Sequence, residues 1–166
     1  MEEKAVVGIV MGSMSDYEGN VSSTCETLES LGIPYEKIVL SAHRTPDETI
    51  EYAKTAYDRG LKVIIAAAGG AAHLAGVIAG CSTLPVIGIP MKTIRLMDDS
   101  LLQLSRCRWC SGCDRCDWQS RMQNAAYLAA TMLALLIHKC IKRSKIIKLD
   151  EEERLRKHEI LEMRKP

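Results

Sequence analysis

The sequence predicts an α/β domain in which helices cover both faces of a central parallel sheet. Short, continuously apolar segments, typical of strands buried on both faces, alternate with longer segments that have a helical pattern. This alternation indicates parallel strands joined by right-handed crossovers. The chain has 166 residues, of which 47% are hydrophobic, and this length and composition suit a single domain over residues 1–166.

The first predicted strand is the apolar run at residues 5–11. Gly12 permits a tight turn after it, and Ser15 and Asp16 are residue types that favour the N-cap of a helix. We expect that helix at about residues 17–31, because a glycine follows it.

The second strand is expected at residues 35–40 and the second helix at residues 46–59, which a proline opens and a glycine closes. A third strand is expected at residues 61–67, and a small-residue loop at residues 68–73 leads from it into a third helix that reaches about Cys81. A fourth strand, which a proline stops, is expected at residues 84–89. The apolar stretch at residues 125–137 is too short to span a membrane and is typical of a buried helix.

Three polar or small-residue loops, at residues 12–16, 41–46 and 68–73, each follow a predicted strand. The carboxyl ends of parallel strands meet at one edge of the sheet, which is where open α/β sheets bind ligands. We therefore expect the three loops to form one site.

The loop at residues 41–46 contains the residues best suited to catalysis. His43 is an imidazole that can exchange protons near neutral pH, and Arg44 beside it suits an anionic substrate. The alternative is a polar loop that only caps the next helix at Thr45. The other two loops have similar alternatives: the first is either an anion site or a simple helix cap, and the third either admits a flat ligand or packs a helix tightly.

Taken together, the loop sequences MGSMSD, SAHRTP and AAAGGAAHLAG closely resemble the motifs of N5-carboxyaminoimidazole ribonucleotide mutase, an enzyme of purine biosynthesis. The resemblance covers about residues 5–93. The arginine in SAHRTP and the histidine in GGAAHL resemble the mutase class, whereas the related class that uses CO2 usually carries a lysine and a different third loop. Ala75 stands where the family usually has proline.

The resemblance implies a flavodoxin-like three-layer αβα sandwich with a central parallel sheet, assembled as a homo-octamer with sites at subunit junctions. It implies that His43 is the general acid and base and that Arg44 contacts the substrate phosphate. Ser13 and Asp16 would bind the ribotide. The surrounding wall of the site would consist of Ser15, Ser41, Gly69, Gly70 and His73.

The chemistry implied by this resemblance moves a carboxyl group from an exocyclic nitrogen to ring carbon C4 of the ribotide. His43 would protonate the nitrogen, CO2 would leave and be recaptured by the ring carbon, and the proton at C4 would return to His43. No metal or organic cofactor is expected. The alternatives are an aminoimidazole ribonucleotide carboxylase that uses CO2, a ribotide-binding module without chemistry, and a cysteine-ligated metal protein.

The last alternative rests on an unusual segment after Thr93, where the resemblance ends. Four cysteines follow one another at intervals of three, a spacing close to that of iron–sulfur or zinc sites: Cys107, Cys110, Cys113 and Cys116. We favour the competing interpretation, a reading-frame shift around residues 103–121. With codons chosen for the purpose, one neighbouring frame of this window reads SIVQMP and the other reads AGGVPVATVAIGNP, close to what the family has there. Sequencing the gene distinguishes the two interpretations.

The remaining features set broader expectations. The formal net charge of +1 gives no general attraction to nucleic acid or to a membrane surface. No signal peptide is expected, so we predict a cytoplasmic protein whose cysteines are mostly reduced. From about residue 141 the chain is highly charged, which predicts a helical extension at the C-terminus.

Overall fold

The structure is a computed structural model that describes residues 4–17, 21–69, 72–91, 111–112 and 118–135. These residues form a sheet in the order β2-β1-β3-β4-β5, in which all neighbouring strands are parallel. The strands are β1 (Val7–Met11), β2 (Tyr35–Val39), β3 (Val63–Ala68), β4 (Val86–Pro90) and β5 (Ser111–Gly112). This strand order is that of flavodoxin-like sheets, so the predicted fold class is confirmed.

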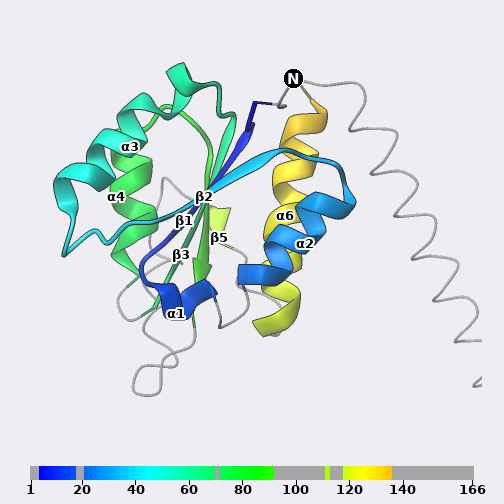
Figure 1. The fold of residues 1–166 in the computed structure, drawn as a ribbon, viewed down its shortest axis with the longest axis horizontal. Helices are drawn as coiled ribbons and strands as arrows, with labels where there is room; N and C mark the ends of the chain where they lie inside the picture. The colour runs from blue at the N-terminus through cyan, green and yellow to red at the C-terminus, as the bar shows by residue number, and fades with distance from the viewer. Residues whose placement is uncertain (1–3, 18–20, 70–71, 92–110, 113–117, 136–166) are drawn as a thin grey trace, which may run out of the picture.

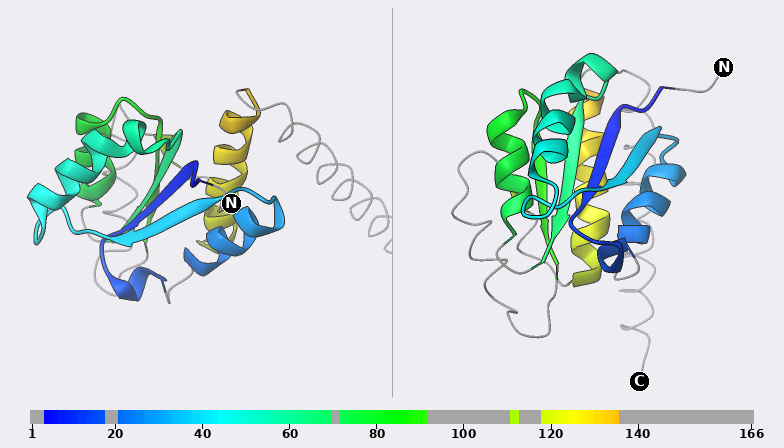
Figure 2. Two further views of the ribbon diagram at one scale, coloured as in Figure 1. Left: turned by 45° about the horizontal axis from the view of Figure 1, so that its top comes forward. Right: turned by 60° about the vertical axis from the view of Figure 1, so that its left-hand side comes forward.

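Helices cover both faces of the sheet (Figure 1). On one face lie α3 (Pro46–Arg59) and α4 (His73–Cys81), and on the other lie α2 (Ser22–Ser30) and α6 (Trp118–Ala134). The views in Figure 2 show the three layers from two further directions. Each face has its own apolar cluster, and the sheet separates the two clusters. Residues of β1, β3 and β4 are buried throughout, which explains their continuously apolar sequences.

The second and third helices agree with their predicted positions. α3 begins at Pro46 and ends at Arg59, and Gly60 follows it with a φ of 103°, a conformation in which glycine has no steric penalty. α4 ends at Cys81, as expected. Strand ends differ from the predictions by up to two residues; the third strand, for example, starts at Val63.

The predicted first helix, at residues 17–31, starts in the wrong place. A short helix, α1 (Met14–Asp16), precedes α2, and its N-cap is Ser13 rather than Ser15 or Asp16. The carboxylate of Asp16 accepts the backbone N–H of Ser13 at 2.9 Å. An acidic side chain at the third helical position satisfies the N-cap residue in this way, and this moves the helix start three residues earlier than a cap at Asp16 predicts.

The second half of the chain contributes the last core helix. In α6, the apolar side is buried against α2 and the sheet, and its buried residues include Met122, Ala129 and Leu133. Thr24 on α2 donates its hydroxyl hydrogen to the carbonyl of Met122 at 3.0 Å, which ties the two helices together. The stretch predicted as a buried helix therefore has that role over its described part.

Several predictions fall on residues outside the described ones. β5 pairs with β4 at Ile87 and Gly88, but the rest of the window at residues 103–117, with its four closely spaced cysteines, lies outside the description. So does the predicted extension from about residue 141. Among the described residues, no helix is both long and apolar enough to cross a membrane.

Candidate active site

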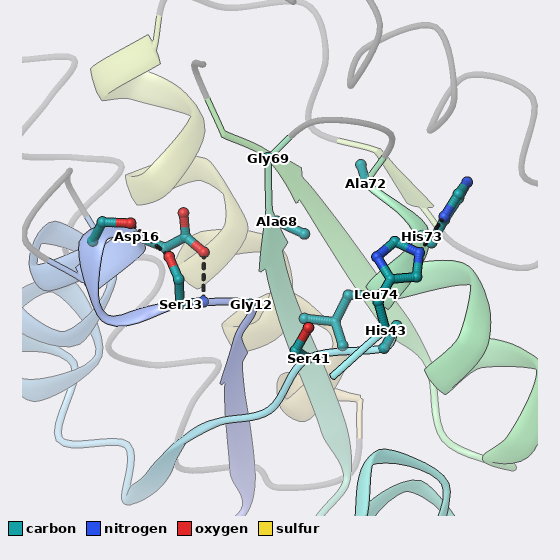
Figure 3. Close-up of a pocket in the computed structure, with 12 residues that line it drawn as sticks. Gly12, Ser13, Asp16, Ser41, His43, Ala68, Gly69, Ala72, His73 and Leu74 are labelled. Atoms are coloured by element: carbon teal, nitrogen blue, oxygen red, sulfur yellow. Dashed lines mark hydrogen bonds between the residues drawn. The ribbon is translucent and has the colours of Figure 1, made fainter. Parts of the chain in front are cut away.

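The three predicted loops meet at the carboxyl edge of the sheet, where they enclose a pocket of about 280 Å³ (Figure 3). One side of the pocket comes from the loop after β1, the middle from the loop after β2, and the other side from the loop between β3 and α4. Its lining residues are Gly12, Ser13, Ser15, Asp16, Ser41, Ala42, His43, Ala68, Gly69, Ala72, His73 and Leu74. The predicted convergence of the loops is therefore observed.

The first loop presents hydroxyl and carboxylate groups at the start of α1. The hydroxyl oxygens of Ser13 and Ser15 lie 2.6 Å apart, within hydrogen-bonding distance. The carboxylate of Asp16 is held on the same side by the backbone N–H of Ser13. These groups can hydrogen-bond the hydroxyls of a sugar or the oxygens of a phosphate.

The second loop is shaped by its own hydrogen bonds. The side chain of Thr45 accepts the backbone N–H of Ser41 at 3.0 Å, and the backbone N–H of Arg44 contacts the Ser41 hydroxyl at 3.3 Å. The Arg44 guanidinium donates to the carbonyl of Gly12 at 2.9 Å, so it bridges the first and second loops. Arg44 does not line the pocket itself, but this bond places its charge beside the first loop.

The third loop brings small residues to the pocket. Ala72 precedes α4 with φ 47° and ψ 35°, a left-handed conformation that is uncommon for a residue with a side chain. Its backbone N–H donates to the carbonyl of Gly69 at 3.1 Å. This turn places His73 at the first position of α4, where it faces the second loop (Figure 3).

The two histidines of the pocket are bonded to each other. Nε2 of His43 lies 2.8 Å from Nδ1 of His73, and the two rings are nearly perpendicular, at 88°. One hydrogen atom occupies this contact, because two N–H groups cannot point at each other and two bare nitrogens cannot form a hydrogen bond. The tautomer of His43 is thus linked to that of His73.

Burial determines the direction in which the pKa of the Asp16 carboxyl group shifts. Loss of solvent raises its pKa above the ordinary value, and this outweighs the hydrogen bonds from Ser13 and Gly12 and the charge of Arg44, which act in the opposite direction. The ionised form of Asp16 therefore has an unfavourable free energy in the folded protein. A ligand that donates hydrogen bonds to this carboxylate would offset the lost solvation.

We expect Asp16→Asn to be at least as stable as the wild type at neutral pH. Because the native carboxyl holds its proton more tightly than the unfolded chain does, wild-type stability falls as the pH rises between the unfolded and the folded pKa. Asparagine does not ionise, so the greater stability of Asp16→Asn over the wild type should be present above the folded pKa of Asp16 and should vanish in acid. Thermal unfolding of both proteins between about pH 3 and pH 7 measures this difference.

Asp47→Asn is the matched control for that experiment. Asp47 lies in the first turn of α3, where a negative charge favours the helix. The control should therefore lose a little stability at neutral pH, opposite in sign to Asp16→Asn. A clear loss of stability in Asp16→Asn at neutral pH would contradict the account of Asp16.

The structure brings together seven of the predicted site residues in one pocket: Ser13, Ser15, Asp16, Ser41, His43, Gly69 and His73. Arg44 lies next to the pocket through its bond to Gly12, and Gly70 is outside the described residues. The sequence reasoning missed the carbonyl of Gly12 and the apolar wall formed by Ala72 and Leu74. It also missed the bond between the histidines, which nothing in the sequence signals because they are thirty positions apart.

The described part of the chain contains no group of three or more His, Cys, Asp or Glu residues that could hold a metal ion. Within that part, Cys25 and Cys81 are free thiols. The four cysteines of the proposed metal site lie outside it, so the structure bears on neither interpretation of that window.

Comparison with protein families gives a match to the AIR carboxylase model over residues 6–154. The chain belongs to the AIR carboxylase family. Among its relatives is the N5-carboxyaminoimidazole ribonucleotide mutase of Bacillus subtilis, which is 57% identical over 100 residues, or 60% of this chain and 61% of that protein. The mutase of Pyrococcus horikoshii is 53% identical over 103 residues, or 61% of this chain and 58% of that protein.

The chain therefore spans about three fifths of the length of these two relatives. A solved structure, that of Treponema denticola PurE, superposes with a TM-score of 0.79 at 23% identity and covers 91% of this chain and 94% of that one. At this identity the superposition supports the fold alone.

Proposed function

We propose that this chain is an N5-carboxyaminoimidazole ribonucleotide mutase of purine biosynthesis, an isomerase. The single observation that carries the proposal is the pocket in which His43 lies between the polar first loop and the small-residue third loop. The names of the relatives in the AIR carboxylase family support the same reaction.

In the proposed binding mode, the sugar phosphate lies against the first loop. Arg44 supplies positive charge to the phosphate, and Ser13 and Asp16 hydrogen-bond the ribotide. Ser15 and Ser41 complete the polar side. The flat imidazole ring lies against the third loop, where Gly69 and Ala72 carry little or no side chain to obstruct it, and where the proposed wall also includes Gly70 and His73.

The proposed reaction begins with His43 in its protonated form. His43 gives a proton to the exocyclic nitrogen of the substrate, the bond between that nitrogen and the carboxyl carbon breaks, and its electron pair stays on nitrogen as CO2 departs. Ring carbon C4 then attacks the CO2, and a new carbon–carbon bond forms. His43 removes the proton from C4, which restores the ring and the protonated imidazole.

Retention of CO2 is the second requirement of this reaction. CO2 is small and apolar, and the pocket wall beside the histidines includes the apolar side chains of Ala68, Ala72 and Leu74. Recapture by a molecule held in the same pocket is effectively unimolecular. Proton transfer and confinement account for the proposed reaction without a metal or an organic cofactor.

The proposal extends to the setting of the enzyme. We propose a cytoplasmic homo-octamer in which residues 1–166 form one domain with a C-terminal helical extension. The edge strand β2 supports association, because Ile38 and Val39 on it are exposed in the single chain and lead directly into the loop of His43. Exposed apolar residues on a sheet edge are typical of contact surfaces.

Two substrates test the function. Purified protein supplied with N5-carboxyaminoimidazole ribonucleotide should form 4-carboxy-5-aminoimidazole ribonucleotide without added CO2, measured by chromatography of the ribotides. With aminoimidazole ribonucleotide and CO2 in place of that substrate, the forward rate should be much lower. The reverse ratio of rates would identify a carboxylase. A module without chemistry would bind aminoimidazole ribonucleotide and exchange no proton at C4 with solvent.

A further inference from the structure

We propose that His73 is a positioning residue that makes Nδ1 of His43 the nitrogen that exchanges the proton with the substrate. This inference rests on the proposed function and adds to it the direction of proton transfer. The observation behind it is the 2.8 Å contact between Nε2 of His43 and Nδ1 of His73. That contact occupies one of the two nitrogens of His43 and leaves the other for the substrate.

Figure 3 shows where the second nitrogens point. The free ring nitrogen of His43 is directed into the pocket, toward the side on which Ser13 and Asp16 lie. The free nitrogen of His73 points away from the pocket. A ribotide held by the first loop would therefore meet Nδ1 of His43, while Nε2 remains with His73.

The shared hydrogen can lie on either histidine, and only one arrangement supports catalysis. If His43 donates from Nε2, its Nδ1 is bare in the neutral ring and can accept the proton from C4 of the ribotide. If His73 donates instead, the hydrogen of neutral His43 lies on Nδ1, and that nitrogen has no lone pair for the substrate. The proposed reaction therefore requires Nδ1 of His73 to accept the hydrogen bond from His43. The hydrogen of His73 itself is then on Nε2, which faces away from the pocket.

The proton balance closes with this assignment. Protonated His43 carries hydrogens on both nitrogens, gives the one on Nδ1 to the exocyclic nitrogen of the substrate, and becomes neutral with Nε2–H still donated to His73. It then takes the C4 proton back on Nδ1. His73 keeps the same proton throughout, so it orients and supports the imidazole as a carboxylate does in a catalytic triad.

The main chain around His73 fits a positioning role. His73 is the first residue of α4, and the left-handed turn at Ala72 sets the direction from which its ring approaches His43. Among the hydrogen bonds of the described residues, the Nδ1 of His73 has His43 as its partner, and no carboxylate contacts either ring. Removal of the His73 ring would thus leave the orientation of His43 without this support.

Two variants of His73 separate orientation from simple packing. His73→Ala removes the acceptor, and we expect turnover to fall about 10- to 100-fold, the range seen for residues that orient a metal-bound histidine, with a much smaller change in KM. His73→Asn places an amide oxygen one bond from Cγ, as Nδ1 is in histidine. It should recover at least about tenfold of the lost turnover. Both residues are tolerated at the first position of a helix, so the fold should be kept.

A direct measurement of the tautomer completes the test and needs no activity. Solid-state NMR of protein carrying isotope-labelled histidine reads which nitrogens are protonated, and the chain has only 4 histidines to assign. In neutral wild-type protein Nε2 of His43 should be protonated and Nδ1 bare, whereas His73→Ala should give a mixture. A bare Nε2 on His43, or a His73→Ala variant with near-normal turnover, would overturn the proposal. If wild-type protein converts neither ribotide, the proposed function is wrong. The NMR result still tests whether His43 donates the hydrogen bond to His73.

Discussion

Replacement of His43 by asparagine should reduce turnover about 10²- to 10⁴-fold, the range that a general acid and base contributes. Asparagine keeps a polar group of similar width within the second loop, but its amide neither holds nor releases a proton near neutral pH. In the proposed reaction, both the departure of CO2 and the removal of the C4 proton depend on that exchange. The loss should therefore appear in kcat.

Binding of the ribotide should survive this substitution. The groups proposed to hold the sugar phosphate are positioned without His43, because Ser13 is bonded to Asp16, and Arg44 is bonded to the carbonyl of Gly12. Calorimetric titration with aminoimidazole ribonucleotide should give a Kd within about tenfold of the wild-type value, a difference of about 1.4 kcal/mol.

Glu48→Gln is a suitable control for the His43 experiment. Glu48 is exposed in the first turn of α3 and does not line the pocket. This variant should have wild-type turnover and affinity. If His43→Asn turns over within about tenfold of the wild type, the proton-transfer role of His43 is wrong.

Ile65→Ala should lower the free energy of unfolding by about 2–5 kcal/mol. Ile65 is completely buried in the middle of β3, with Ile9 of β1 and Ile87 of β4 beside it in register. Truncation removes the burial of three carbon atoms and leaves a cavity that neighbouring strands cannot close, because both are fixed by the sheet hydrogen bonds. Urea unfolding at a fixed protein concentration measures the loss.

Tyr57→Ala provides the comparison. Tyr57 lies on α3 and is 59% exposed, so its truncation should cost less than about 1 kcal/mol in the same assay. Turnover of Ile65→Ala at a temperature where it remains folded should be close to wild type, because the pocket is built from loops beyond the strand ends. A loss at Ile65 no larger than at Tyr57 would contradict the description of the core.

Much of the fold could be predicted because its signals are local. The glycine after Arg59 and the proline at position 46 define α3 to the residue, and buried central strands require the apolar runs that mark β1 and β3. The start of α1 could not be placed, since a carboxylate at Asp16 serves as well from inside the helix as from its cap. Two residue types that favour a cap therefore did not determine where the helix starts.

The candidate site was predictable as a set of residues but not as a set of contacts. The parallel topology requires the three loops to share one sheet edge, and this alone places His43 opposite the first and third loops. The bond between His43 and His73, and the one between Arg44 and Gly12, depend on side-chain directions across the pocket. Such directions follow from tertiary packing, which residue spacing does not encode.

The bond from Arg44 to the carbonyl of Gly12 has a consequence for the energetics of recognition. A free arginine side chain carries about 2 kcal/mol of rotamer entropy. An arginine that is already held against the opposite loop has lost part of this entropy during folding. In the proposed binding mode, the phosphate of the ribotide then meets a preorganised cation whose remaining N–H groups are directed by the bond that is already formed. A lysine at this position, with one rotatable ammonium group, would lose its rotamer entropy each time it binds the ligand.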